Sequence, residues 1–357
     1  MTELHVHYRE DELLADNEIA QPLFAGGVRC HGGYTDDGAY LPPRTKYRVP
    51  ATKAWQHSHR AQFGTEILDA PIDLWPEPYP NVAQAKYLLS EGVREPIITS
   101  LTRIGTVEGF GSMIRHVGVG DMQPFFDESI DGTCTQHLQR GLFEAQARDE
   151  AGHGNEAGHR QMWFAARDIA FEHPVTEDET QLMLQRMGIA PPGGAGAAAA
   201  EVVPFFPDLD LSLEMMLRRM TSLLFIEISA FHTFAWAEAV LSDTELVAGD
   251  GEAATLVACI RADETPHVDY LRTALTEMRD RTFIGSSGKK IAGTAVIGTL
   301  WDALLADSLG ARRNALLKTT LAEVEHALHG NRRHDEILDG FHAHGSVRPP
   351  FVQETSR

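Results

Sequence analysis

Two short stretches decide the fold of this chain: Arg148-Asp149-Glu150-Ala151-Gly152-His153 and Arg261-Ala262-Asp263-Glu264-Thr265-Pro266-His267. Each stretch contains the pattern Asp-Glu-x-x-His. On an α-helix, residues three positions apart lie on the same side, about 60° from each other, because each residue advances by roughly 100°. A carboxylate and an imidazole with this offset can bind one metal ion. Two facing helices of this kind can hold two ions if two further helices each supply one more carboxylate.

Both patterns fall on apolar helix faces. On a helical wheel with Glu150 at the origin, His153 lies near −60°, while Phe143 and Phe164 lie within about 60°. The apolar residues within about 40° of Glu264 are Val257, Ile260, Val268, Leu271, Leu275 and Met278. Ionisable groups in an apolar stripe are costly unless they are paired or bind a metal ion. We therefore expect both Glu-x-x-His pairs to be metal ligands, and the alternative is a buried salt-bridge network.

Two lone glutamates complete the expected set. If residues 211–241 and 251–282 form an antiparallel hairpin, Glu227 lies level with Glu264 on an apolar face. In the first half of the chain, Glu108 is the acid nearest to the level of Glu150, and Glu91 is its rival. The predicted metal ligands are Glu108, Glu150, His153, Glu227, Glu264 and His267.

Two other Glu-x-x-His pairs are not expected to bind metal. His159, which follows Glu156, lies about 180° from Glu150 on the wheel, so this pair is expected to face away from the core. Glu323 and His326 share no face with the apolar residues of their own helix, so solvent exposure is expected for them. Large apolar residues near the predicted ligands either line a substrate pocket or simply fill the core: Phe110, Phe143, Met220, Phe225, Phe231 and Phe234.

The composition excludes several classes of function. The chain has 357 residues, of which 43% are hydrophobic, and its net charge of −20 argues against nucleic acid or an anionic membrane as partner. The first residues are polar and acidic and lack a basic region followed by an apolar stretch, so no export signal is expected, and no apolar run is long enough to span a bilayer. Three scattered cysteines exclude a Cys-x-x-Cys metal site and suit a reducing cytoplasm, which is the expected location.

The chain divides into three parts. Residues 1–80 are rich in Gly, Pro and aromatic residues and are expected to form an irregular N-terminal extension with short helices. Residues 81–331 are expected to form one helical bundle with a linker near 189–205, and residues 332–357 a C-terminal tail. The helices expected from periodicity span 81–94, 97–118, 135–172, 177–188, 211–241, 251–282, 290–309 and 311–331. Since no stretch shows sustained β alternation, the predicted class is all-α.

The pattern resembles the ferritin-like diiron-carboxylate superfamily over roughly residues 97–282. The resemblance implies a four-helix bundle that binds two iron ions, with a manganese–iron pair as the alternative. It implies that Glu150 and Glu264 bridge the two metals and that the lone glutamates bind at the outer ends. It also implies that Asp149 and Asp263 each form a hydrogen bond with a ligand histidine and fix its ring.

The activity implied by the resemblance is oxygen chemistry. We expect a diiron oxygenase or oxidase that acts on a small or acyl-type organic substrate with O₂ and takes electrons from an external reductase. Ala157 stands where a radical-generating subunit would carry a tyrosine, and no Cys₄ iron centre is present. The alternatives are a ferroxidase or peroxide-detoxifying protein and a helical interaction protein without metal. Helices beyond the bundle, such as 290–309, also leave room for a homodimer.

Overall fold

The computed structural model describes residues 4–172, 176–186 and 203–345. Most of the predicted linker near 189–205 and the end of the predicted tail lie outside these ranges. Within them the protein is mostly helical, as predicted. The helices are α1 (Glu10–Leu13), α2 (Thr45–Phe63), α3 (Val82–Ser90), α4 (Glu95–Gly111), α5 (Cys134–His137), α6 (Phe143–Ala151), α7 (His159–Phe171), α8 (Glu177–Arg186), α9 (Leu211–Leu241), α10 (Glu252–Arg279), α11 (Gly293–Asp307), α12 (Arg313–Ala327) and α13 (His334–Gly345).

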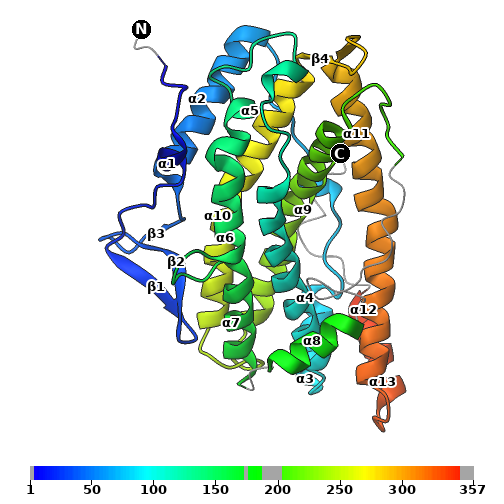
Figure 1. Ribbon diagram of the computed structural model, residues 1–357. Coiled ribbons are helices and arrows are strands. Elements are labelled where there is room, and N and C mark those ends of the chain that lie inside the picture. Colours follow the sequence, from blue (N-terminus) through cyan, green and yellow to red (C-terminus); the bar gives the residue numbers. More distant parts are fainter. Residues whose placement is uncertain (1–3, 173–175, 187–202, 346–357) are drawn as a thin grey trace, which may run out of the picture.

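The centre of the molecule is built from α4, α6, α7, α9 and α10 (Figure 1). Helix α9 packs along α10, α7 packs against both α4 and α10, and α6 packs against α4. Helix α11 covers α9 and α10, while α13 packs on α3, so residues 334–345 of the predicted tail are helical. These contacts place the segments that carry Glu108, Glu150, Glu227 and Glu264 around one interior.

The N-terminal extension is more regular than predicted. It forms a three-stranded antiparallel sheet in the order β1 (Gln21–Ala25), β2 (Val28–Tyr34), β3 (Tyr40–Leu41), followed by the long helix α2. Helix α2 packs against α10, and strands β1 and β2 contact α7 (Figure 1). A second, two-stranded sheet joins β4 (Thr282–Ile284) to β5 (Lys290–Ala292). The sheet alternation in residues 21–41 is too short and too rich in glycine to be visible as a strand pattern in the sequence.

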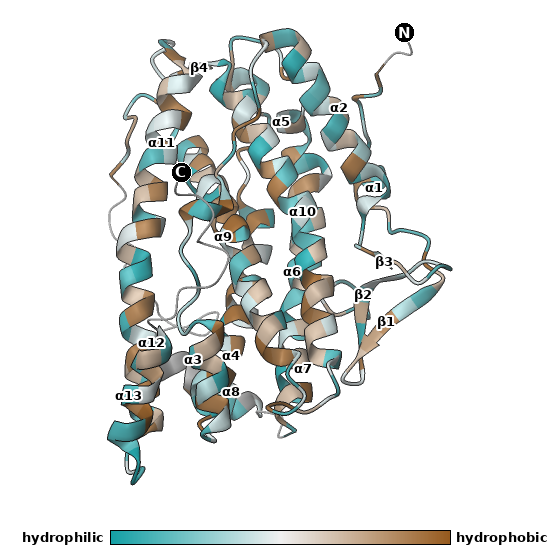
Figure 2. Ribbon diagram, turned by 180° about the vertical axis from the view of Figure 1, so that it is seen from behind, coloured by the Kyte–Doolittle hydropathy of each residue, from teal (hydrophilic) through white to brown (hydrophobic). Residues whose placement is uncertain are grey.

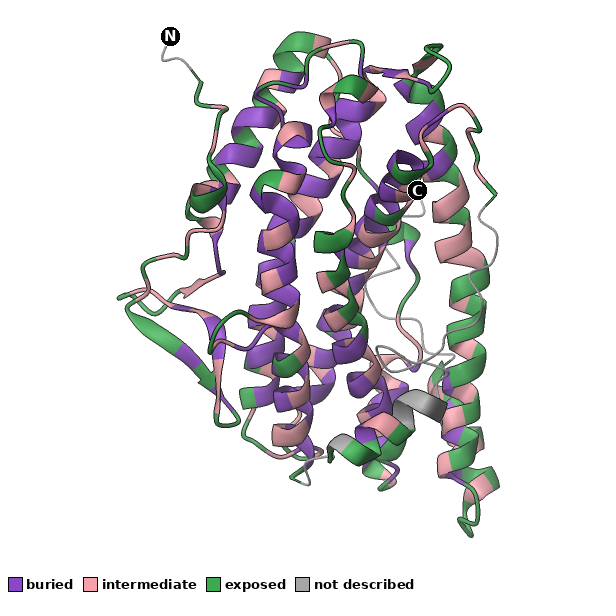
Figure 3. Ribbon diagram, viewed as in Figure 1, coloured by how far each residue is buried: buried purple, intermediate pink, exposed green. Residues whose placement is uncertain are grey.

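The apolar core consists of two clusters separated along the helix axes. Brown residues gather on the inward sides of the helices in Figure 2, and the same sides are buried in Figure 3. On α9, one cluster takes buried residues up to Ile228 and the other begins at Ala230. On α10, one cluster ends at Ile260 and the other begins at Tyr270. On α10, Glu264 and His267 lie between these limits, and on α9 Glu227 directly precedes Ile228, so the charged groups occupy the layer where the two apolar clusters meet.

The predicted helix over 135–172 is wrong in one important respect, because it is broken into α5, α6 and α7. Helix α6 ends at Ala151, and a tight turn precedes α7. In that turn Gly152 has φ 84° and Gly154 has φ 60°. The His153 N–H donates to the Glu156 carbonyl and the Glu156 N–H donates to the His153 carbonyl, both at 3.1 Å. Positive φ values of this kind are easy for glycine and end the helix here.

Helix α9 is, among the described residues, the one helix long and apolar enough to cross a membrane by length and composition. Half of its most apolar window is buried inside the protein, and Glu227 lies within the helix. Its buried apolar residues pack in the interior, as those of the core helix of a folded protein do.

Candidate metal centre

The structure brings five of the six predicted ligands together. Glu108, Glu150, Glu227, Glu264 and His267 have exposed fractions between 0% and 7% and meet in the layer between the two apolar clusters. They come from α4, α6, α9 and α10, so each of these helices directs a carboxylate into the same interior. The predicted register of the two hairpins, from which the lone glutamates were placed, agrees with this arrangement.

The sixth predicted ligand, His153, is not in the cluster. It is exposed in the turn that follows α6, because the helix on which its prediction relied ends two residues earlier. His159, which the wheel placed on the opposite side, is fully buried and occupies the position expected of His153. The signal that could have revealed this is the spacing of Gly152, Gly154 and Gly158, since several glycines in a helical pattern mark a turn.

Two carboxylates lie between the two histidines. Glu150 Oε2 is 3.1 Å from His159 Nδ1, and Glu150 Oε1 is 3.4 Å from His267 Nδ1. Glu264 shows the same arrangement, because its Oε1 lies 3.0 Å from His159 Nδ1 and its Oε2 lies 2.7 Å from His267 Nδ1. Each carboxylate thus directs one oxygen toward each imidazole, which is the arrangement that a carboxylate bridging two metal ions requires.

The remaining carboxylates lie at the two ends of this unit. Glu108 Oε2 is 3.4 Å from His159 Nδ1, and Glu227 Oε1 is 3.9 Å from His267 Nδ1. Two groups of potential ligand atoms result, each with its atoms within 4.8 Å of one another: Glu108, Glu150 and His159 in one, and Glu150, Glu227, Glu264 and His267 in the other. Glu150 belongs to both groups, so the two candidate metal positions are adjacent.

Burial and mutual contact shift the pKa values of the glutamates and histidines in the cluster. Burial, together with the nearby Glu264, raises the pKa of Glu108 to about 8, and burial and Glu264 also raise the pKa of Glu227 well above its usual range. Burial acts against ionisation of Glu264 too, but His159 and His267 hold its pKa below the ordinary value. Although burial disfavours a charged imidazole, Glu264 raises the pKa of His267 to about 9. Divalent cations would neutralise these carboxylates in place of protons.

Buried polar atoms without hydrogen bonds support the same interpretation. Glu108 Oε2 and Glu264 Oε1 are buried, yet neither accepts a hydrogen bond of good geometry from the described residues. Orphaned carboxylate oxygens deep in a protein are costly, and ligation of a cation is one of the ways in which that cost is offset. The residues present, four carboxylates and two imidazoles, therefore fit a pair of oxygen-preferring metal ions such as iron or manganese better than zinc, which takes four ligands.

The two predicted aspartates contact the histidines in a crossed arrangement. Asp149 precedes Glu150 on α6, but its Oδ2 lies 2.9 Å from Nε2 of His267 on α10. Asp263 is on α10, and its Oδ2 lies 3.4 Å from Nε2 of His159 on α7. Each imidazole therefore directs Nδ1 toward the cluster and Nε2 toward an aspartate of another helix. The contact of His267 is a hydrogen bond, which fixes the ring and makes it a stronger ligand, whereas Nε2 of His159 has no hydrogen bond of good geometry with the described residues and its contact with Asp263 is electrostatic.

The N-terminal extension supplies partners that sequence reasoning missed. Arg44 Nε donates to Asp149 Oδ1 at 2.8 Å, and Arg48 lies 2.7 Å from Asp149 Oδ2. Burial works against an ionised Asp149, but these two guanidinium groups hold its pKa well below the usual range. On the other side, His31 Nε2 lies 2.9 Å from Asp263 Oδ2, and the Tyr40 hydroxyl donates to Asp263 Oδ1 at 2.9 Å. The extension thus forms the outer layer of the site.

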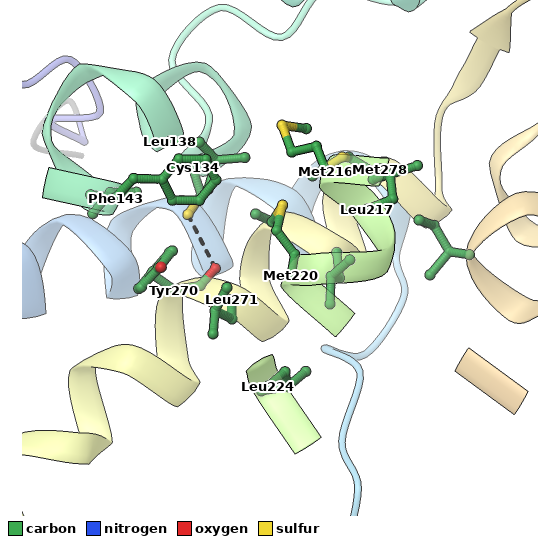
Figure 4. Close-up of a cluster of buried hydrophobic side chains, with 14 of the residues drawn as sticks. Cys134, Leu138, Phe143, Met216, Leu217, Met220, Leu224, Tyr270, Leu271 and Met278 are labelled. Carbon is green, nitrogen blue, oxygen red and sulfur yellow. Dashed lines mark hydrogen bonds between the residues drawn. The ribbon is translucent and has the colours of Figure 1, made fainter. Parts of the chain in front are cut away.

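A polar relay and an apolar layer close the side of the cluster toward α5. Gln146 Nε2 donates to Glu227 Oε1 at 2.5 Å, and its own Oε1 accepts a hydrogen bond from the buried Tyr270 hydroxyl. Figure 4 shows Tyr270 among Cys134, Phe143, Met220 and Leu224, with the Cys134 thiol donating to the Tyr270 carbonyl. This layer excludes water from the cluster. Phe143, Met220 and Phe225 belong to it as core residues.

Two cavities lie between α4 and α9, and the first of them borders the cluster. The first has a volume of about 280 Å³, and Glu108 and Phe234 form part of its wall. The second has a volume of about 340 Å³, and Phe110 and Gly111 are among its lining residues. A Cβ atom at Gly111 would lie 2.9 Å from Glu150 Cδ, so this lining residue of the second cavity packs directly against that carboxylate. Of the aromatic residues expected near the ligands, Phe110 and Phe234 therefore line cavities.

Comparison with known proteins adds no relative to this picture. No protein-family model matches the chain, and neither a curated protein nor a solved structure shows significant similarity to it. What the structure defines is a mostly helical protein with a buried cluster of glutamates and histidines that could hold metal ions.

Proposed function

We propose that this protein is a non-haem diiron enzyme with a ferritin-like four-helix arrangement, in which α4, the α6–α7 pair, α9 and α10 enclose two iron ions. A manganese–iron pair is the alternative metal content. Glu150 and Glu264 would bridge the metals, with Glu108 and His159 at one end and Glu227 and His267 at the other. The observation that carries the proposal is the placement of one oxygen of each central carboxylate beside each histidine.

The proposal departs from the family pattern at one place. His159 follows Glu150 across a turn instead of lying one helical turn later on the same helix. The outcome is nevertheless equivalent, because His159 and His267 both present Nδ1 to both central carboxylates. The crossed contacts with Asp149 and Asp263 are consistent with the ring orientation that metal ligation needs.

The proposed reaction is the oxidation of a small or acyl-type organic substrate with O₂, using electrons from an external reductase. Two irons held by these ligands would supply the electrons for the activation of O₂ and would be reduced again by the external reductase. The chain's own residues exclude water, orient the imidazoles through their aspartates, and hold Glu227 through Gln146 and Tyr270. The cavities that border Glu108 and Gly111 favour an organic substrate over simple iron storage, because they offer an apolar molecule space at Glu108 and beside the residue that packs on Glu150.

The test is metal quantification combined with spectroscopy. Anaerobic loading of the purified protein with Fe(II) should give about two irons per chain, and exposure of the reduced protein to O₂ should produce an absorption change that depends on both irons. O₂ uptake should be slow without an organic substrate and a reductase. Rapid uptake with Fe(II) alone and storage of the oxidised product would instead identify a ferroxidase. Absence of stoichiometric metal would reject the metal centre itself.

A further inference from the structure

We propose that the second cavity, between the end of α4 and α9, binds the organic substrate as an apolar carboxylic acid. Its carboxylate would pair with Arg219 at the cavity mouth, and its apolar chain would extend toward Gly111 and Glu150. This assignment rests on the proposed metal centre for its catalytic meaning, but the binding site is defined by residues outside the cluster.

The wall of this cavity is mainly apolar. Its apolar lining residues are Val107, Phe110, Met113, Ile114, Val117, Leu223 and Ile226. Three neighbours on α4 and the 3-10 helix that follows it remain unusually exposed for their type: Val107 at 37%, Phe110 at 46% and Met113 at 49%. Contiguous exposed apolar surface of this kind is characteristic of binding sites. The cavity therefore selects an apolar body.

The charge at the mouth of the cavity is positive. The charged residues that line it are Arg218 and Arg219, and no acidic side chain is among its lining residues. Arg218 is already engaged, because it pairs with Glu214 and lies over the ring of Phe205. Arg219 is exposed, and within the described ranges it has no hydrogen bond or ion pair. In a chain with a net charge of −20, an unpaired guanidinium beside an apolar cavity points to an anionic head group.

The geometry orients the ligand. Arg219, Leu223 and Ile226 lie on one face of α9, since they are spaced by four and three residues. Arg219 and Glu227 are separated by roughly 12 Å along the helix axis, at 1.5 Å per residue. A ligand anchored at Arg219 would therefore present to the cluster a carbon remote from its carboxylate. Gly111 marks the end of the cavity nearest to the cluster, because it lines the cavity and packs directly against Glu150.

Binding of decanoate to the full-length protein tests this assignment without any turnover. Isothermal titration calorimetry on chelator-treated and on metal-loaded protein should show binding of decanoate that is tighter than that of decan-1-ol. Arg219→Gln should weaken decanoate binding about tenfold or more, because a charge-assisted hydrogen bond is lost, and should leave decan-1-ol binding unchanged. Arg332→Gln is the matched control, since Arg332 is exposed and lies outside the lining of the cavity. It should behave as the unmodified protein.

A second variant tests the location. Ser222 lines the same cavity and is half-buried, so Ser222→Trp should fill the space and weaken both decanoate and decan-1-ol. Equal binding of decanoate to the Arg219→Gln variant, or binding unaffected by Ser222→Trp, would overturn the assignment. Loss of reductase-supported electron transfer with intact decanoate binding in Arg219→Gln would also overturn it and identify a protein-docking face. Decanoate binding by a protein that takes up no iron would reject the metal centre while leaving the carboxylate site in place.

Discussion

The two histidines of the cluster reach equivalent positions through different local structures. His267 lies one turn after Glu264 on α10, which continues through Pro266 without a break. His159 is the first residue of α7 and is separated from Glu150 by a glycine-rich turn. Both rings nevertheless direct Nδ1 to the same two carboxylates. The comparison teaches that a site of this kind is defined by where side chains end in space, and that a fixed sequence spacing is only one way to achieve it.

The outer contacts connect the two halves. Asp149 stands beside Glu150 in sequence but contacts His267, and Asp263 stands beside Glu264 but contacts His159. Each half of the site thus holds the histidine of the other half. The N-terminal extension strengthens both contacts, with Arg44 on Asp149 and Tyr40 on Asp263. This crossing makes correct packing of α6 and α7 against α10 a condition for a correctly oriented pair of ligands.

The largest expected effect is a loss of iron loading, and it shows whether His159 or His153 is the ligand in the first half of the site. His159→Ala should reduce iron from about two per chain to one or fewer, because it removes the only buried imidazole beside Glu108 among the described residues. His153→Ala should leave iron loading unchanged, since His153 is exposed in the turn. Metal quantification after anaerobic loading and desalting measures both variants. Loss of iron in His153→Ala with retention in His159→Ala would show that the turn adopts another structure in the loaded protein.

The second half of the site and the helical class could be predicted from the sequence. On α10 the apolar stripe is continuous, so the wheel placed Glu264 and His267 correctly in the interior, and hairpin geometry then placed Glu227 beside them. Glu108 was predicted by the same hairpin geometry, although the apolar face of its helix is less continuous. These successes share one condition, which is that helical periodicity holds without interruption between the residues compared.

The remaining residues could not be predicted because their positions depend on turns and on long-range packing. The wheel excluded His159 because it assumed one helix across Gly152 and Gly154, where the chain turns. His31 and Arg44 precede the bundle and carry no periodic signal, and their proximity to Asp263 and Asp149 arises only when the extension wraps around the core. Buried polar partners of this kind are selected by three-dimensional contact, which the spacing of residues does not encode.

A smaller effect should follow from changes in the turn itself. Gly152 has φ 84° and ψ 166°, a conformation almost restricted to glycine, and a Cβ there would lie 2.5 Å from the Glu156 carbonyl oxygen. Gly152→Ala should therefore lower stability by about 1–3 kcal/mol from backbone strain alone and should weaken metal binding by displacing His159. Urea denaturation and metal titration measure the two consequences.

Gly154→Ala is the matched control in the same turn. Gly154 also has positive φ, at 60°, but nothing lies within 4 Å of the position of its Cβ. Its cost should be limited to about 1–2 kcal/mol for the left-handed conformation, with metal affinity retained. If Gly154→Ala weakened metal binding as much as Gly152→Ala, general destabilisation of the turn would account for the loss, and the specific positioning of His159 would not be needed.

The smallest expected effect is a change of stability with pH. Glu108 at one end of the cluster and His267 at the other both contribute to it. In chelator-treated protein, Glu108 has its pKa raised from 4.5 to about 8, mainly by burial. The pKa of His267 is raised from 6.5 to about 9, because Glu264 outweighs the opposing effect of burial. Between pH 6.5 and 9 the folded protein therefore binds more protons than the unfolded chain. Stability should consequently fall as pH rises through this window, with a decrease of a few degrees in Tm.

Metal loading should reverse this trend. Ligation requires deprotonated glutamates and neutral imidazoles, so the gain in Tm from added Mn(II) should grow from pH 6.5 to 9 as fewer protons have to be displaced. Thermal denaturation with and without Mn(II) measures the difference. Glu108→Gln should remove the part of the metal-free trend that ends near pH 8 and leave the part due to His267, which continues to about pH 9, and this difference separates the two ends of the site. A metal-free Tm that rises through this window would mean that the buried groups do not share protons as their contacts indicate, and the equivalence of the two ends would then fail.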